Sequence, residues 1–304
     1  MANNDKQSWL RNWLAHNRLG EDYLASAQHW FDPLARTLAQ YSADASRPVL
    51  IAVNGSQGSG KSTLCDYLQQ VLERQYGLRA ITLSLDDFYH TRLMRQQLSQ
   101  TTHTLFAIRG VPGTHDFNLL NATLDGLLKG GGKDRIVEIP RFDKALDDRC
   151  PDSDREHMQS PLDIVLLEGW CLGALPQAPE ALLEPLNTLE RTEDLGGAWR
   201  TQVNGFLARE FVPLYQRVDQ WVMLQAPSFD CVYQWRLQQE KKLALTLTEG
   251  AGTQVMNEGD VARFIQHYQR LTEHCLGSLP SQVDHLYTLD EARQILSYKN
   301  QRLD

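Results

Sequence analysis

The distribution of hydrophobic residues along the chain predicts an α/β protein. Short apolar runs rich in β-branched residues occupy residues 49–54, 80–85, 163–169 and 221–226. Runs of this length and composition are typical of strands that are buried on both faces of a parallel sheet. A last strand is expected near residues 285–289.

Longer segments, in which apolar residues recur every three or four positions, predict helices between these strands. They cover residues 61–76, 116–129, 198–218, 228–247 and 258–276. Strands that alternate with helices in this way are typical of a parallel sheet flanked by helices. Gly77 is expected to end the first helix, since glycine readily adopts the left-handed conformation found after a helix C-terminus.

Two regions depart from the strand–helix alternation. Residues 1–46 have apolar residues at helical spacing and predict an N-terminal helical appendage, with Pro33 in the first turn of a helix or at a break between two. Residues 91–160 are polar and rich in Gly, Pro and Asp, with a short strand expected at 135–139. They predict an insertion over the end of the sheet where α/β folds bind ligands, within a main domain of residues 47–304.

One segment carries a phosphate-binding motif. Residues 55–62 read GSQGSGKS and match GxxxxGK[ST] in full, directly between the first predicted strand and the first predicted helix. Glycines let backbone N–H groups curl around phosphate oxygens, and the helix N-terminus adds partial positive charge. The motif predicts binding of ATP with Mg²⁺, with Lys61 on the β- and γ-phosphates and the Ser62 hydroxyl on the metal. The expected nucleotide contacts are Gly55, Ser56, Gln57, Gly58, Ser59, Gly60, Lys61, Ser62 and Thr63.

The second predicted strand ends in the sequence SLDDFY, residues 84–89. A carboxylate at this point can face the phosphate loop and accept the proton of an attacking hydroxyl group. Because side chains alternate along a strand, Asp86 and Asp87 are expected to point to opposite faces, so that only one can be the base. The alternative is that both carboxylates cap the following helix.

Composition excludes several classes of protein. The formal net charge of −8 argues against a general nucleic-acid binder, and the chain has no NKxD motif for reading guanine. The five cysteines are scattered and form no CxxC pair, which disfavours a zinc site or a disulfide framework; Cys65 is expected to fill the core. We expect a cytoplasmic protein without a membrane span, because no signal-peptide pattern and no apolar run of about 20 residues occurs.

Several motifs together resemble a known family. SLDDFY resembles the SxDxFY motif of the uridine kinase, phosphoribulokinase and pantothenate kinase group of P-loop kinases. Four further motifs resemble the plant-type D-glycerate 3-kinase family and its related fungal and bacterial ATP-dependent kinases: RGVPGTHD (109–116), IPRFDKALDDR (139–149), LLEGWCLG (166–173) and VYQWRLQQE (232–240). The similarity extends from about residue 49 to about residue 290.

The resemblance implies roles for individual residues. Asp86 corresponds to the catalytic base of the group. Glu168 stands at the Walker B position, where it would hold Mg²⁺ through water or contact the acceptor hydroxyl. The segment 228–247 corresponds to the lid helix, from which Arg236 would stabilise charge on the transferring phosphoryl group.

The insertion supplies fixed positive charge for an anionic acceptor. Arg109, Arg141 and Lys144 suit a carboxylate or phosphate group, and ordinary surface ion pairs are the alternative. His115 follows a tight turn and is a further candidate for acceptor binding, with simple packing as its alternative. Phe142 is the only aromatic residue that the sequence places near these cations, so no pair of rings is expected to stack a nucleoside base.

These observations predict an ATP-dependent kinase that transfers the γ-phosphate to a small hydroxyl compound, with D-glycerate as the expected acceptor and 3-phosphoglycerate as the product. A uridine- or pantothenate-kinase-like acceptor is one alternative. A nucleotide-binding regulator that hydrolyses ATP without an acceptor is another. Asp86 together with Glu168 argues against the regulator, since a switch needs no acceptor base.

Overall fold

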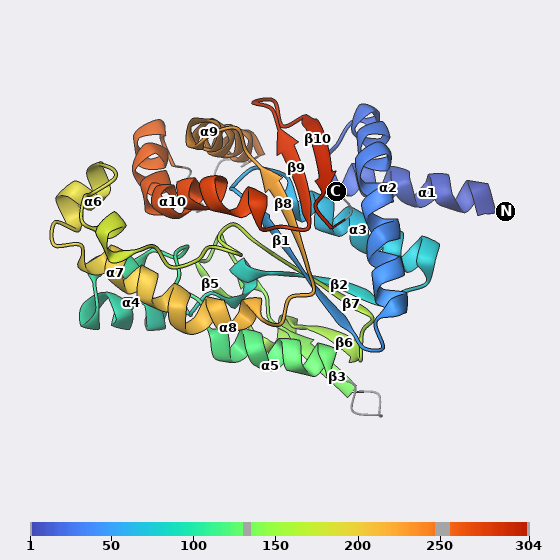
Figure 1. Cartoon of the computed structure of the whole chain (residues 1–304), viewed down its shortest axis with the longest axis horizontal. Helices are drawn as coiled ribbons and strands as arrows, with labels where there is room; N and C mark the ends of the chain where they lie inside the picture. Colours follow the sequence, from blue (N-terminus) through green and yellow to red (C-terminus); the bar gives the residue numbers. More distant parts are fainter. Residues whose placement is uncertain (1, 130–134, 247–255, 303–304) are drawn as a thin grey trace.

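The computed structural model describes residues 2–129, 135–246 and 256–302. In these residues a central sheet has the strand order β10-β9-β8-β1-β7-β2 (Figure 1). All neighbouring strands are parallel except β10, which runs antiparallel to β9. The strands are β1 (Val49–Gly55), β2 (Ala80–Ser84), β7 (Ile164–Gly169), β8 (Gln220–Gln225), β9 (His285–Leu289) and β10 (Ile295–Asn300).

The α/β prediction is confirmed, but the prediction that residues 285–289 form the last strand is wrong. The additional strand β10 closes one edge of the sheet with the sequence ILSYKN. Its residues are half-buried or exposed and none is fully buried, as an edge strand allows. It therefore lacks the apolar run by which the buried strands are recognised in the sequence.

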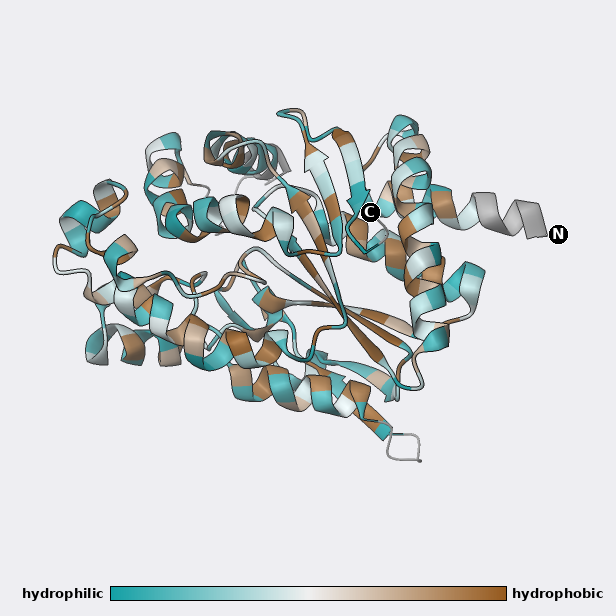
Figure 2. Cartoon of the chain, viewed as in Figure 1, coloured by the Kyte–Doolittle hydropathy of each residue, from teal (hydrophilic) through white to brown (hydrophobic). Residues whose placement is uncertain are grey.

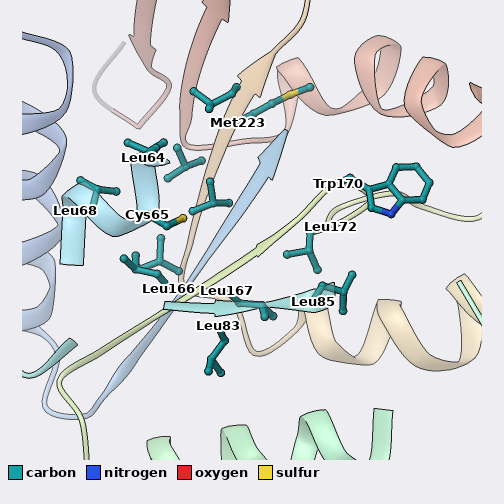
Figure 3. Packing of buried hydrophobic residues seen from close by; sticks show 14 of the residues in the cluster. Leu64, Cys65, Leu68, Leu83, Leu85, Leu166, Leu167, Trp170, Leu172 and Met223 are labelled. Atoms are coloured by element: carbon teal, nitrogen blue, oxygen red, sulfur yellow. The ribbon is translucent and has the colours of Figure 1, made fainter. Parts of the chain in front are cut away.

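The core lies around the central strands, where every residue of β1 and β7 is buried. Figure 2 shows hydrophobic residues concentrated along these strands. Leu64 and Leu68 of α3 (Lys61–Tyr76) lie with Leu166, Leu167 and the other side chains drawn in Figure 3 in one buried cluster. Cys65 is fully buried in the same cluster, which confirms its predicted place in the core.

Helix α3 begins and ends as the sequence predicts. Gly60 precedes it with φ 94°, and Gly77 follows it with φ 67°. The Gly77 N–H donates to the carbonyls of Leu72 and Glu73, which would otherwise lack partners at the helix end.

The N-terminal appendage consists of α1 (Ala2–Asn17) and α2 (Glu21–Asp44), so its helical prediction is confirmed. Both expectations for Pro33 are wrong, because this residue lies inside α2 and the chain breaks at Gly20 instead. Tertiary contacts offset the cost of about 3 kcal/mol that an interior proline carries. The Tyr67 hydroxyl of α3 donates to Asp32 at 2.7 Å, and the Tyr287 hydroxyl of β9 donates to the carbonyl of Trp30 at 3.0 Å.

The insertion lies between β2 and β7 along the chain. Its predicted helix and strand are confirmed, while α4 has no sequence signal because its apolar residues are largely exposed and its buried residue is Arg95. The elements are α4 (Arg92–Thr101), α5 (Phe117–Leu128), β3 (Arg135–Ile139) paired with β6 (Glu156–Ser160), and β4 (Phe142–Asp143) paired with β5 (Asp148–Arg149).

The second half of the chain adds the remaining helices. The predicted helix over 198–218 is present, with a π-helical turn at Leu207–Phe211 in its middle. None of the described helices combines the length and apolar character needed to cross a bilayer. The helices are α6 (Thr188–Glu193), α7 (Ala198–Phe206), α8 (Val212–Tyr215), α9 (Phe229–Thr246) and α10 (Glu258–Ser278).

Candidate active site

The phosphate loop, residues 55–62, connects β1 to α3 in a tight turn. Gly58 has φ 78°, and a Cβ there would lie 2.8 Å from the Cβ of Trp235 on α9. A Cβ on Gly55 would lie 2.5 Å from the Ser59 hydroxyl. Position 58 therefore requires glycine, whereas a side chain at Gly55 would displace the Ser59 hydroxyl within the loop.

Three polar side-chain atoms of this loop are buried and find no hydrogen-bond partner among the described residues: Ser56 Oγ, Gln57 Oε1 and Ser59 Oγ. A buried polar atom without a partner costs about 1–3 kcal/mol. Their concentration in one loop, at the N-terminus of α3, is expected of a site that receives a polar ligand. The structure therefore supports the predicted phosphate contacts, which themselves stay a prediction.

Glu168, at the end of β7, meets the phosphate loop. The Ser62 hydroxyl donates to its Oε1 at 2.8 Å, and Lys61 Nζ lies 3.5 Å from its Oε2. The Glu168 side chain is buried, and Oε2 accepts no hydrogen bond from the described residues. A hydroxyl and a carboxylate with spare acceptor capacity are oxygen ligands that fit Mg²⁺, which keeps its other positions for water and phosphate. No cluster of three acidic, histidine or cysteine residues that could hold a metal occurs in the described residues.

Asp86 and Asp87 lie on a short 3₁₀ helix, Leu85–Phe88, which directly follows β2. The prediction that strand alternation separates them is wrong, since the chain has already turned. They still point apart, because Asp86 bonds to the Tyr89 hydroxyl and to Lys144, whereas Asp87 bonds to Arg141. The capping alternative is also wrong for α4, whose N-cap bond comes from the hydroxyl of Thr91.

Asp86 lines a pocket that we call the Asp86 pocket. Four cationic side chains line it with this single carboxylate: Lys61 from the phosphate loop, Arg109 and Lys144 from the insertion, and Arg236 from α9. Counting +4 for the cations and −1 for Asp86 leaves +3 for the lining. The predicted loop, base, insertion and lid thus all contribute side chains to one pocket. Lys61 and Arg236, which both line it, are 175 residues apart in the sequence (61 to 236).

The electrostatics of Asp86 are set by these cations. Burial alone would raise the pKa of Asp86, but the charges of Lys144 and Lys61 outweigh burial, assisted by hydrogen bonds from Lys144 and Tyr89. The pKa of Asp86 is therefore held well below its usual value, while the Asp86 carboxylate raises the pKa of Lys144. The Lys144 Nζ lies 2.6 Å from Asp86 Oδ2, and the Lys144 side chain is 62% exposed, so that an acceptor can approach its ammonium group from solvent.

The two arginines of the pocket are held from outside it. Arg109 pairs with Asp147, and its Nη2 donates to the carbonyl of Lys144 at 3.3 Å. Arg236 pairs with Glu240 one turn along α9. Each guanidinium retains further N–H donors that can reach a ligand, since the group carries five.

Three predicted acceptor residues do not line the Asp86 pocket: Glu168, which meets the phosphate loop as described above, Arg141 and His115. Arg141 pairs with Asp87 at 2.9 Å and with Glu156 at 2.6 Å. His115 is buried and stacks on Tyr89 with ring centroids 4.5 Å apart, and burial lowers its pKa to about 3. His115 therefore stands behind Tyr89, which lines the pocket, whereas Arg141 is held by two carboxylates that do not line it. Direct contact with an acceptor stays a prediction for each.

The sequence reasoning missed the aromatic wall of the pocket. Phe142 is not the only ring near the cations, because Tyr89, Trp170, Phe264 and Tyr268 line the Asp86 pocket. The rings of Trp170 and Tyr268 meet edge to face, with their centres 4.9 Å apart. The guanidinium carbon of Arg236 lies 5.5 Å from the ring centre of Phe264. Tyr89 and Trp170 belong to the quoted motifs and could have been found there, whereas Phe264 and Tyr268 follow only the ordinary apolar spacing of a helix.

Comparisons with known proteins relate the chain to kinases. No family model matches the chain. It is 32% identical over 269 residues to the uncharacterized kinase mug58 of Schizosaccharomyces pombe, covering 86% of this chain and 92% of that protein. It is 29% identical over 236 residues to the chloroplastic D-glycerate 3-kinase of Arabidopsis thaliana, covering 73% of this chain and 46% of that protein. The solved D-glycerate 3-kinase of Cryptococcus neoformans var. grubii superposes with a TM-score of 0.69 at 25% identity, covering 88% of this chain and 96% of that one.

Proposed function

Because this chain belongs to the family of ATP-dependent P-loop kinases that includes D-glycerate 3-kinase, we propose that it phosphorylates D-glycerate with ATP and releases 3-phosphoglycerate and ADP. The observation that carries this proposal is the Asp86 pocket. It sets one carboxylate, able to accept a proton, among cations able to hold an anionic acceptor.

In the proposed complex, the phosphate loop binds the nucleotide. Its backbone N–H groups and Lys61 bind the phosphates and orient the γ-phosphorus toward the Asp86 pocket. Ser62 and Glu168 would hold Mg²⁺, which supplies positive charge to the β- and γ-phosphate oxygens when bound. The buried Oε2 of Glu168, which accepts no hydrogen bond from the described residues, supports this assignment.

Asp86 and the insertion bind the acceptor. In the proposed complex, the acceptor carboxylate binds Lys144 and Arg109, which leaves one acceptor hydroxyl beside Asp86. Once Lys144 is drawn to the acceptor, the pKa of Asp86 rises toward its ordinary value, so the base gains strength when the acceptor is in place. Asp86 takes the hydroxyl proton as the oxygen attacks the γ-phosphorus and the bond to ADP breaks.

Arg236 on the lid helix α9 acts on the transferring phosphoryl group. Its guanidinium lines the same pocket as Lys61 and Asp86, so it can reach the phosphoryl group between them. Positive charge at this point stabilises the transition state, in which charge spreads over the transferring oxygens. The ion pair with Glu240, which also lies on α9, holds the guanidinium in this orientation.

A nucleoside acceptor is the second candidate, because four aromatic side chains line the pocket. It is the weaker candidate, since a neutral nucleoside would leave Lys144 and Arg109 without an anionic partner from the acceptor. A regulator without an acceptor has no use for the exposed Lys144 beside Asp86.

An acceptor screen with purified protein tests the proposal. ADP release is measured with D-glycerate, glycerol, uridine, pantothenate or no acceptor, and the product is identified by phosphorus NMR. We expect stimulation by D-glycerate and none by glycerol, because glycerol lacks the carboxylate and leaves the cations unpaired. Turnover with uridine or pantothenate alone would contradict the substrate and leave the kinase assignment intact. Equal ADP release with and without every acceptor would favour the regulator.

A further inference from the structure

Two aromatic side chains of the Asp86 pocket bond to the backbone of the turn that carries Arg109. The Tyr268 hydroxyl, on α10, donates to the carbonyl of Arg109 at 3.0 Å. The indole N–H of Trp170, which directly follows β7, donates to the carbonyl of Gly110 at 3.0 Å. Two consecutive carbonyls are thus bound by residues that are 98 positions apart in the sequence (170 to 268).

Gly110 allows this close approach. Its φ is 142°, and a Cβ at this position would overlap the hydroxyl and the ring of Tyr268. Trp170 and Tyr268 are both buried, and their rings meet edge to face, so each supports the other beside the turn. Their polar atoms are therefore engaged with the backbone of the turn.

The turn is closed and anchored at its other end by separate bonds. The Gly110 N–H donates to the Thr114 hydroxyl at 3.1 Å, and that hydroxyl donates to the carbonyl of Val111 at 2.7 Å. The His90 N–H donates to the carbonyl of Thr114 at 2.8 Å. The bonds from the two aromatic residues consequently hold the end of the turn that carries Arg109.

The guanidinium of Arg109 lines the Asp86 pocket, where it is positioned only weakly by its own ion pair. The side chains of Arg109 and its partner Asp147 are 24% and 37% exposed. Ion pairs this accessible to water contribute little to holding a side chain in place. Hydrogen bonds from two buried donors to the backbone restrain the same residue more firmly.

We propose that Trp170 and Tyr268 are positioning residues for acceptor binding: they hold the Arg109 backbone so that its guanidinium is preset for the acceptor carboxylate. The inference rests on the proposed function, since it needs an anionic acceptor in the Asp86 pocket. A preset cation loses less conformational entropy when the acceptor binds. The aromatic wall thereby has a task other than stacking a nucleoside base.

Removal of single polar groups tests this role. Tyr268→Phe removes only the hydroxyl, and Trp170→Phe removes the other donor. The matched control is Tyr287→Phe, because the Tyr287 hydroxyl also donates to a backbone carbonyl, that of Trp30, at 3.0 Å, and lies outside the Asp86 pocket. Arg109→Ala removes the guanidinium and leaves the bonded carbonyl in place. We measure kcat, KM for D-glycerate and KM for ATP in each variant and in the double variant of Tyr268→Phe with Arg109→Ala.

We expect Tyr268→Phe and Trp170→Phe each to raise KM for D-glycerate about three- to tenfold, the range for one hydrogen bond. Because Arg109 binds the acceptor equally before and during transfer, kcat and KM for ATP should change by less than about twofold. In the Arg109→Ala background, Tyr268→Phe should have no further effect on KM, since it acts through the missing guanidinium. Tyr287→Phe should match the wild type in all three constants.

Additive effects of Tyr268→Phe and Arg109→Ala would mean that the hydroxyl contacts the acceptor directly, and would overturn the positioning role. So would a KM for D-glycerate that neither aromatic variant changes. Hydrogen exchange of residues 109–116, measured without ligand, should be faster in Tyr268→Phe than in the wild type and Tyr287→Phe; equal exchange in all three also overturns the role. A wild type that D-glycerate does not stimulate contradicts the proposed function instead, and the same kinetic cycle then decides the positioning role with whichever anionic acceptor drives turnover. Turnover with neutral acceptors alone contradicts both.

Discussion

Lys144 and Asp86, 58 residues apart in the sequence, form an ion pair of 2.6 Å at the mouth of the Asp86 pocket. The pair joins the insertion to the end of β2. It holds Asp86 in its charged form, and an acceptor carboxylate would compete for the same ammonium group. This relationship connects acceptor binding to the strength of the base.

Replacing Lys144 should alter both acceptor affinity and pH dependence. In Lys144→Ala, KM for D-glycerate should rise about tenfold or more, as expected for the loss of one charge-assisted hydrogen bond. Because Lys144 lowers the pKa of Asp86, its removal should move that pKa up, so the acid limb of kcat/KM shifts to higher pH. The measurement is kcat/KM between pH 4 and pH 8.

The exposed Lys129, paired with Asp125 on α5, offers a matched control. Lys129→Ala should leave KM and the pH profile unchanged. An acid limb that stays in place in Lys144→Ala would show that this lysine does not control the base.

Asp86 and Asp87 can be separated by isosteric replacement. Asp86→Asn cannot accept a proton, so kcat should fall at least about 10²-fold while ATP affinity changes little. Asp87→Asn should cost less, because Asp87 bonds to Arg141 and does not line the pocket. Steady-state kinetics of both variants decide the matter, and the reverse ranking would assign the base to Asp87.

Glu168 should determine the requirement for magnesium. Glu168→Gln keeps an oxygen for the Ser62 hydroxyl but removes the charge, so half-maximal activity should need about tenfold more Mg²⁺. The readout is a Mg²⁺ titration at fixed ATP, with Glu180→Gln at an exposed position as the control. An unchanged Mg²⁺ requirement in Glu168→Gln would remove this residue from the metal site.

His115 should make the protein sensitive to acid. Its folded pKa of about 3 lies below the unfolded value of about 6.5, so its contribution to stability is present above pH 6.5 and is lost as the pH falls toward 3. At pH 5 the loss should be about 2 kcal/mol. His115→Phe keeps the ring beside Tyr89, and since both ring nitrogens lack partners in the described residues it leaves no new unpaired group.

Urea unfolding at pH 7 and pH 5 measures this effect. The free energy of unfolding should fall less for His115→Phe than for the wild type between the two values. Equal losses in both proteins would mean that other groups account for the acid sensitivity.

Local parts of the structure could be predicted because local interactions decide them. The run β1, phosphate loop and α3 depends on neighbouring residues: a β-branched strand, glycines at positive φ and a terminal Gly77. The position of Asp86 directly after β2 likewise depends on residues close to it in the sequence. Hence the nucleotide loop and the candidate base could be identified from the sequence.

The tertiary structure alone decided which distant groups reach these residues. Arg109 and Arg141 look alike in the sequence, but Asp147 holds the first at the pocket, whereas Asp87 and Glu156 hold the second away from it. Pro33 remains inside α2 only through contacts with elements far along the chain. The physical reason is that ion pairs and packing across long separations depend on the folded positions of both partners, which a linear pattern of residues does not contain.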